Sequence, residues 1–93
     1  MFFFRPNPNF KQEGHFFLAK IRTYKSGEII DVRISRTSEL SAVGGGYFVR
    51  KNLVGSKSFD QATLEVFLTR GQRIKQATID GGEFIPVKAW NNL

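Results

Sequence analysis

Apolar and polar residues alternate along two neighbouring segments near the start of the chain. Every second residue is apolar or small over residues 15–24, and the alternation resumes over residues 30–35. A period of two is typical of a strand with one buried face. Lys25-Ser26-Gly27-Glu28 separates the segments and offers a glycine for the turn. The pattern predicts an antiparallel hairpin with these residues on its inward face: Phe17, Ala19, Ile21, Thr23, Ile30, Val32 and Ile34.

One segment in the second half of the chain has the features of a capped helix. Ser58 is a favourable N-cap residue, and Gln61 follows three residues later, as in a capping box. Gly71 suits the left-handed conformation that ends many helices. A helical projection gathers three polar residues into one narrow stripe and leaves the rest mostly apolar: Gln61, Glu65 and Thr69. We therefore expect a helix over residues 59–70 that is covered on several sides and plugs one end of a curved sheet.

Three further strands are expected around this helix. Residues 47–54 are rich in β-branched and aromatic side chains, which favours a strand. Residues 72–79 and 83–89 are expected to form a second hairpin, because Asp80-Gly81-Gly82 between them suits a tight turn. Residues 37–46 end in three glycines and are expected to form a flexible connecting loop.

The two ends of the chain differ in pattern. Residues 1–14 have no regular period and contain two prolines, so we interpret them as an N-terminal arm with a short edge strand around residues 2–4. An apolar arm is expected to pack back on the domain or to pair with a second copy of the chain. Residues 15–93 are expected to form a single small β-rich domain, since 93 residues can bury one core.

The expected order of elements is therefore β-β-β-α-β-β, which makes the fold mainly β. This order resembles the OB-fold, a small antiparallel five-stranded barrel with a helix between its third and fourth strands. The resemblance implies an OB-like barrel or a strongly curved sheet, of a kind that often binds single-stranded nucleic acid or sugars. An open α+β sheet with the helix on one face fits the same order.

Composition narrows the functional classes. The chain has 14 Lys and Arg against 8 Asp and Glu, a net charge of +6, which favours a polyanionic partner such as nucleic acid. It has no cysteine and a single histidine, His15, so the usual metal sites and nucleophile–base pairs cannot be built. We expect no enzyme activity, metal, cofactor or small-molecule substrate. The opening apolar run is too short for a signal peptide or a membrane span, so we expect a cytoplasmic protein without a membrane partner.

The expected strands carry cations and aromatic rings on their outward faces. Single strands are bound by cations that contact phosphates and by rings on which bases stack. The candidate nucleic-acid-binding residues are Lys20, Arg22, Tyr24, Arg33, Tyr47, Arg50 and Lys51. A weaker candidate for one backbone phosphate is the entrance of the expected helix, where N–H groups and a lysine come together: Ser56, Lys57 and Ser58. Single-stranded DNA or RNA is the favoured partner.

A protein-interaction module is the alternative function. The aromatic arm at residues 2–4 and the widely apolar helix suit association with protein, as in an inhibitor, an adaptor or an oligomeric structural protein. A homodimer is expected on the same grounds. Salt distinguishes the two functions, because phosphate contacts weaken with added salt and an apolar interface does not.

Overall fold

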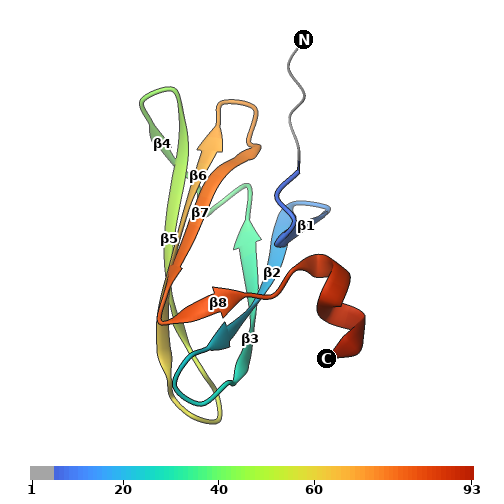
Figure 1. Cartoon of the computed structure of the whole chain (residues 1–93). Coiled ribbons are helices and arrows are strands. Elements are labelled where there is room, and N and C mark those ends of the chain that lie inside the picture. The colour runs from blue at the N-terminus through green and yellow to red at the C-terminus, as the bar shows by residue number, and fades with distance from the viewer. Residues whose placement is uncertain (1–5) are drawn as a thin grey trace.

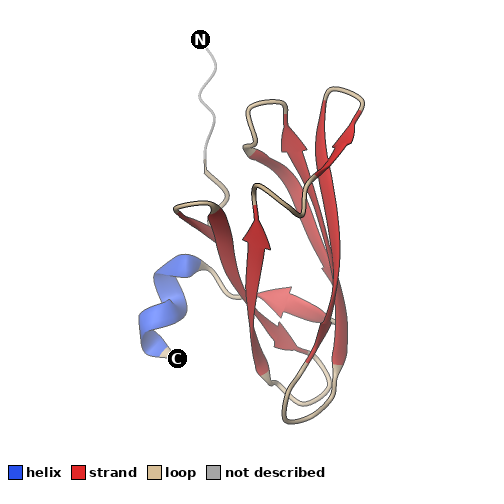
Figure 2. Ribbon diagram, turned by 180° about the vertical axis from the view of Figure 1, so that it is seen from behind, coloured by secondary structure: helices blue, strands red, loops and turns tan. Residues whose placement is uncertain are grey.

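Two antiparallel β-sheets pack against each other in the computed structural model, which describes residues 6–93 (Figure 1). The first sheet contains β1 (Phe10–Glu13), β2 (Phe16–Thr23), β3 (Ile29–Ser35) and β8 (Gly82–Phe84). The second sheet contains β4 (Ser41–Val43), β5 (Gly46–Val54), β6 (Gln61–Thr69) and β7 (Ile74–Asp80). A short 3₁₀ helix, η1 (Val87–Asn92), lies beside the first sheet (Figures 1 and 2).

Strand β2 organises the first sheet. Strand β3 pairs along one edge of β2, from Phe16 to Arg22. The other edge is shared, because β1 pairs with its first half and β8 pairs with its last three residues. The second sheet is a simple meander in which the long β5–β6 hairpin pairs nine residues of each strand, with a bulge between Phe67 and Leu68 where β6 meets β7.

The inner faces of the two sheets share one hydrophobic core. The first sheet contributes Phe10, Phe17, Ala19, Ile21, Val32 and Ile34. The second sheet contributes Val49, Leu53, Ala62, Leu64, Val66, Leu68 and Ile74. The expected inward face of the first hairpin is thus confirmed, because the alternation that defines it continues without interruption through both strands. The strand expected at residues 47–54 is also confirmed as β5.

The expected helix over residues 59–70 is wrong, because this segment is strand β6. Its even-numbered residues from Ala62 to Leu68 are buried, and Leu64 and Val66 are among the most completely buried side chains of the core. Ser58, the expected N-cap residue, instead stabilises a loop: its hydroxyl accepts a hydrogen bond from the Asp60 N–H at 3.1 Å. The helix plug of the expected β-β-β-α-β-β order is therefore absent, and the only helix within residues 6–93 is η1.

The OB-like barrel is not confirmed, since the strands form two sheets that do not close into one barrel. The second expected hairpin is also wrong: β7 pairs with β6, whereas β8 crosses to pair with β2. Gly81 has a positive φ of 89°, as its turn position predicts, but it forms a corner between sheets. A Cβ at Gly81 would lie 2.6 Å from the Gln61 carbonyl oxygen, so the corner needs glycine.

Two connecting regions are more ordered than expected. Within residues 37–46 the chain forms β4, and Gly45 turns it into β5 with a φ of 83°. Residues Phe10–Glu13, expected in the arm, form β1. The edge strand expected around residues 2–4 lies outside the described residues. No helix within residues 6–93 is long and apolar enough to cross a membrane.

Candidate functional site

A groove lies on the outer side of the first sheet, which faces away from the second sheet. Its floor is formed by β2 and β3, and η1 supplies one wall through Trp90. The groove has a volume of about 270 Å³, slightly below the usual range for ligand pockets. We call it the Trp90 groove and define it by the outward side chains that line it: Leu18, Lys20, Asp31, Arg33 and Trp90.

The indole ring of Trp90 is held in a fixed position. Pro86 immediately precedes η1, and the Val87 N–H donates to the Pro8 carbonyl at 2.9 Å, which ties the helix to the start of the described chain. The Trp90 Nε1–H donates to the Ile85 carbonyl oxygen at 2.9 Å. Because its polar end is satisfied, the ring presents an apolar surface to the groove.

Cations alternate with aromatic rings on this side of the sheet. The Lys20 ammonium lies 5.4 Å from the centre of the Trp90 ring and also pairs with Asp31 at 2.5 Å. The Arg33 guanidinium lies 4.6 Å from the centre of the Phe16 ring. Arg22 follows Lys20 on the same side, opposite Glu83 of β8. Cation–π contacts of this kind position the charged groups, and Asp31 offsets part of the charge of Lys20.

The predicted nucleic-acid-binding residues fall into three groups. Lys20, Arg22 and Arg33 lie on the outer side of the first sheet, and the exposed Tyr24 follows β2 directly. The remaining three residues belong to β5. Arg50 is on the outer side of the second sheet, whereas Tyr47 and Lys51 are on its inner side. The structure therefore brings together four of the seven candidates and separates the other three from them.

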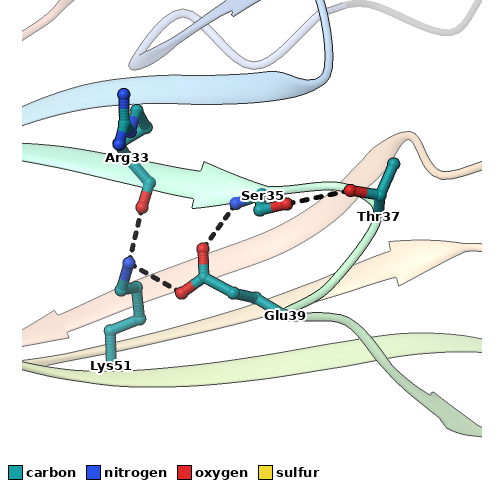
Figure 3. Close-up of polar contacts among 5 residues, drawn as sticks. All are labelled: Arg33, Ser35, Thr37, Glu39 and Lys51. Atoms are coloured by element: carbon teal, nitrogen blue, oxygen red, sulfur yellow. Dashed lines mark hydrogen bonds and ion pairs between the residues drawn. The ribbon is translucent and has the colours of Figure 1, made fainter.

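Arg50 is on the outer side of the second sheet, where it pairs with Glu65 at 3.7 Å. Tyr47 is on the inner side and packs against the core. Lys51 is also on the inner side and links the two sheets (Figure 3). Its ammonium donates to the Arg33 carbonyl and pairs with Glu39 at 2.8 Å. Lys51 is thus a structural residue in this arrangement.

The Glu39 carboxylate completes this link between the sheets. One oxygen meets Lys51 and the other accepts a hydrogen bond from the Ser35 N–H at 2.5 Å (Figure 3). Partial burial alone would raise the pKa of Glu39, but these two donors outweigh it and lower the pKa. The link holds the loop after β3 against β5.

The expected phosphate site at Ser56, Lys57 and Ser58 already has an anion. The Glu28 carboxylate accepts hydrogen bonds from the Ser58 N–H at 2.8 Å, the Ser58 hydroxyl at 2.6 Å and the Lys57 N–H at 3.2 Å. The Ser58 hydroxyl and then the Ser58 N–H lower the pKa of Glu28. The donors that would hold a phosphate are therefore occupied by the protein's own carboxylate.

A second carboxylate joins the same two segments from the other side. Asp60, only 9% exposed, accepts hydrogen bonds from the Thr23 hydroxyl at 2.8 Å and from the Ser26 hydroxyl and N–H. The Ser26 and then the Thr23 hydroxyl lower the pKa of Asp60. We call the two segments, residues 24–28 and residues 55–60, the loop end; they lie together at the bottom of Figure 1.

The outer side of the second sheet carries an aromatic pair. The rings of Phe48 and Phe67 lie on adjacent strands with centres 4.7 Å apart, and Phe67 is 42% exposed. Exposed Val43 of β4 lies on the same side of this sheet. These three residues form the Phe67 patch.

Sequence reasoning missed Trp90 and Phe16 as members of the site. The signal for Phe16 was present, since it shares the outward side with Lys20 in the alternating pattern. Trp90 carried no such signal, because its position depends on the crossing of β8 to β2.

Residues 6–93 contain no group of three or more acidic, histidine or cysteine side chains placed to hold a metal ion. Comparisons with protein-family models, with curated proteins and with solved structures give no match.

Proposed function

We propose that this protein is a non-enzymatic binding protein for single-stranded nucleic acid and that it binds the strand in the Trp90 groove. The observation that supports this proposal is the pairing of Lys20 with Trp90 and of Arg33 with Phe16 on one outward surface. Cations for phosphates and rings for bases are the two components of such sites. The proposal includes an intracellular location.

The groove matches the chemistry of a nucleotide. The apolar surfaces of Trp90 and Leu18 suit the face of a base; Lys20 and Arg33 line the same groove, and Arg22 is the next outward cation along β2. The exposed carboxylate of Asp31 can accept a hydrogen bond from an exocyclic amino group of a base. This mode of binding needs only an outward strand surface and a fixed ring, so it does not depend on an OB-like barrel.

Fluorescence polarisation with a labelled oligonucleotide tests the proposal. We expect the logarithm of the association constant to fall with the logarithm of the salt concentration, with a slope of about −0.7 per phosphate contact. Lys20→Ala with Arg22→Ala removes two phosphate contacts. The slope therefore becomes less steep by about 1.4, and the affinity drops at least about tenfold at low salt. Arg33→Ala, which leaves the Lys20–Asp31 pair intact, is expected to weaken binding in the same direction.

Arg70→Ala with Lys75→Ala is the matched control. It removes the same charge from exposed positions in the β6–β7 connection and at the start of β7, and it leaves the first sheet unchanged. An equal loss of affinity in both double variants would mean that overall charge, and not this surface, governs binding. Absence of binding at low salt would overturn the proposal.

The Phe67 patch favours a second candidate function, association with protein. Exposed aromatic residues that lie together on a sheet are typical of protein interfaces. The expected apolar helix is no longer a basis for this candidate, because it is strand β6. The patch replaces the helix as the surface through which a homodimer would form.

A further inference from the structure

We infer that a strand bound in the Trp90 groove continues along β2 to the loop end, where Tyr24 and Phe59 stack further bases. This inference rests on the proposed function and extends its site beyond the groove. It adds Phe59 to the candidate residues and places it with Tyr24, which the sequence already suggests, at the loop end.

The outward side of β2 leads directly from the groove to the loop end. Lys20, Arg22 and Tyr24 occupy alternate positions, and the Tyr24 N–H donates to the Gly81 carbonyl at 3.1 Å, which continues the pairing of β2 with the β8 side. At about 3.3 Å per residue, Lys20 and Tyr24 are roughly 13 Å apart along the strand. Tyr24 is 71% exposed, so its ring is available at the end of this row of cations.

Phe59 has an unusual backbone conformation. Its φ is 61°, in the left-handed region that bulky residues rarely adopt, and its side chain is 73% exposed. The core gains little from a ring in this position. Backbone strain that is maintained without a packing benefit is a feature of binding sites.

Hydrogen bonds to the two carboxylates hold the backbone of the loop end in place. Ser58 is bound by Glu28 and Asp60 is bound by Thr23 and Ser26, so the residues on both sides of Phe59 are fixed. The Gly55 N–H also donates to the Asp60 carbonyl at 2.8 Å, which closes the loop. A loop whose backbone is already ordered loses less entropy when it binds a ligand.

Two lysines of the loop end are exposed to solvent, and its two carboxylates are bound between the loops. Glu28 and Asp60 are engaged in hydrogen bonds between the loops, whereas Lys25 and Lys57 are exposed, and an open hollow lies between the two loops. Exposed lysines beside exposed rings suit an anionic partner with flat apolar groups. Continuity with the groove favours nucleic acid over an anionic lipid surface.

The inference is tested by comparing oligothymidylates of about 4 and about 16 nucleotides, the range of site sizes for single-strand binding folds. The test variant combines Tyr24→Ala with Phe59→Gly, since glycine adopts the observed φ without strain. We expect it to bind the short oligonucleotide like the wild type and the long one at least about fivefold more weakly, the smallest loss typical of one stacked base. Thermal unfolding at the wild-type temperature would show that the fold is intact.

Val54→Ala is the control, because it removes an exposed apolar side chain from the outer side of the second sheet, outside the Phe67 patch. It is expected to leave the affinity for both lengths unchanged. If the test variant binds the long oligonucleotide like the wild type, the inference is overturned and the proposed function stands. If the wild type binds neither length, both are overturned. Loss of binding to anionic phospholipid vesicles, with oligonucleotide binding unchanged, would assign the loop end to a lipid surface and overturn the inference.

Discussion

Glu28 and Asp60 show how single residues determine the shape of the loop end. Each carboxylate accepts three hydrogen bonds from residues on the other side of the loop end, and neither has a cationic side chain among these partners. In the sequence, Asp60 follows Ser58 in a pattern typical of a helix start. The bonding partners of Asp60 are more than thirty residues away in the chain, so a local pattern does not reveal them.

The two carboxylates predict sensitivity to acid. The pKa of each group is lower in the folded protein than in the unfolded chain, so the unfolded chain binds more protons near pH 4. The stability that they contribute is present at neutral pH and is lost as the pH falls through the lowered pKa values. Glu28→Gln with Asp60→Asn is expected to be less stable at pH 7 and to lose less stability between pH 5 and pH 3, as measured by urea unfolding.

Glu83→Gln removes one charge from an exposed position and is the control. A double variant that keeps the wild-type pH dependence would contradict this role.

At the scale of elements, β6 forms the centre of the second sheet. Leu64 is 0% exposed, whereas Phe67 on the opposite side is 42% exposed. Leu64→Ala is therefore expected to lower the free energy of unfolding by about 2–5 kcal/mol. Phe67→Ala is expected to cost about 1 kcal/mol, mainly from the lost contact with the Phe48 ring. Chemical denaturation measures both values, and equal losses would contradict the assignment of the two sides.

The sequence predicts secondary-structure elements well where the pattern of apolar residues is local and fits a single period. The β2–β3 hairpin is correct because its alternation is strict and its turn contains Gly27 with a φ of 80°. The β6 segment fits two periods at once: Gln61, Glu65 and Thr69 are four residues apart, and they are also all on the outward side of a strand. The capping pattern at Ser58 favoured the helix, although pairing with β5 and β7 determines the structure.

The candidate site was predictable only in part, because some of its residues are placed by local alternation and others by pairing between distant segments. Lys20, Arg22 and Arg33 lie on a locally encoded hairpin, so their common side could be predicted from alternation. Trp90 reaches them because the chain turns at Gly81 and crosses to the first sheet. That pairing joins segments that are distant in sequence, and nothing near Trp90 encodes it.

At the scale of the molecule, the two sheets present different outer surfaces. The first combines cations with fixed rings, and the second carries the Phe67 patch. If the patch forms a homodimer, light scattering will give twice the chain mass of 10.6 kDa at high concentration, and added salt will change it little. Phe67→Lys is expected to restore the single-chain mass by placing a charge in the interface. A wild-type mass of 10.6 kDa at all concentrations would exclude the dimer.

The corner at Gly81 also determines when the groove is completed during synthesis. A growing chain emerges with its N-terminal part first, so β2 and β3 can pair long before β8 and η1 exist. Until then the nascent hairpin has its cations but lacks the Trp90 wall. The complete groove therefore forms only once η1 has been synthesised; under the proposed function, an earlier nascent chain would bind RNA only through weak, salt-sensitive contacts.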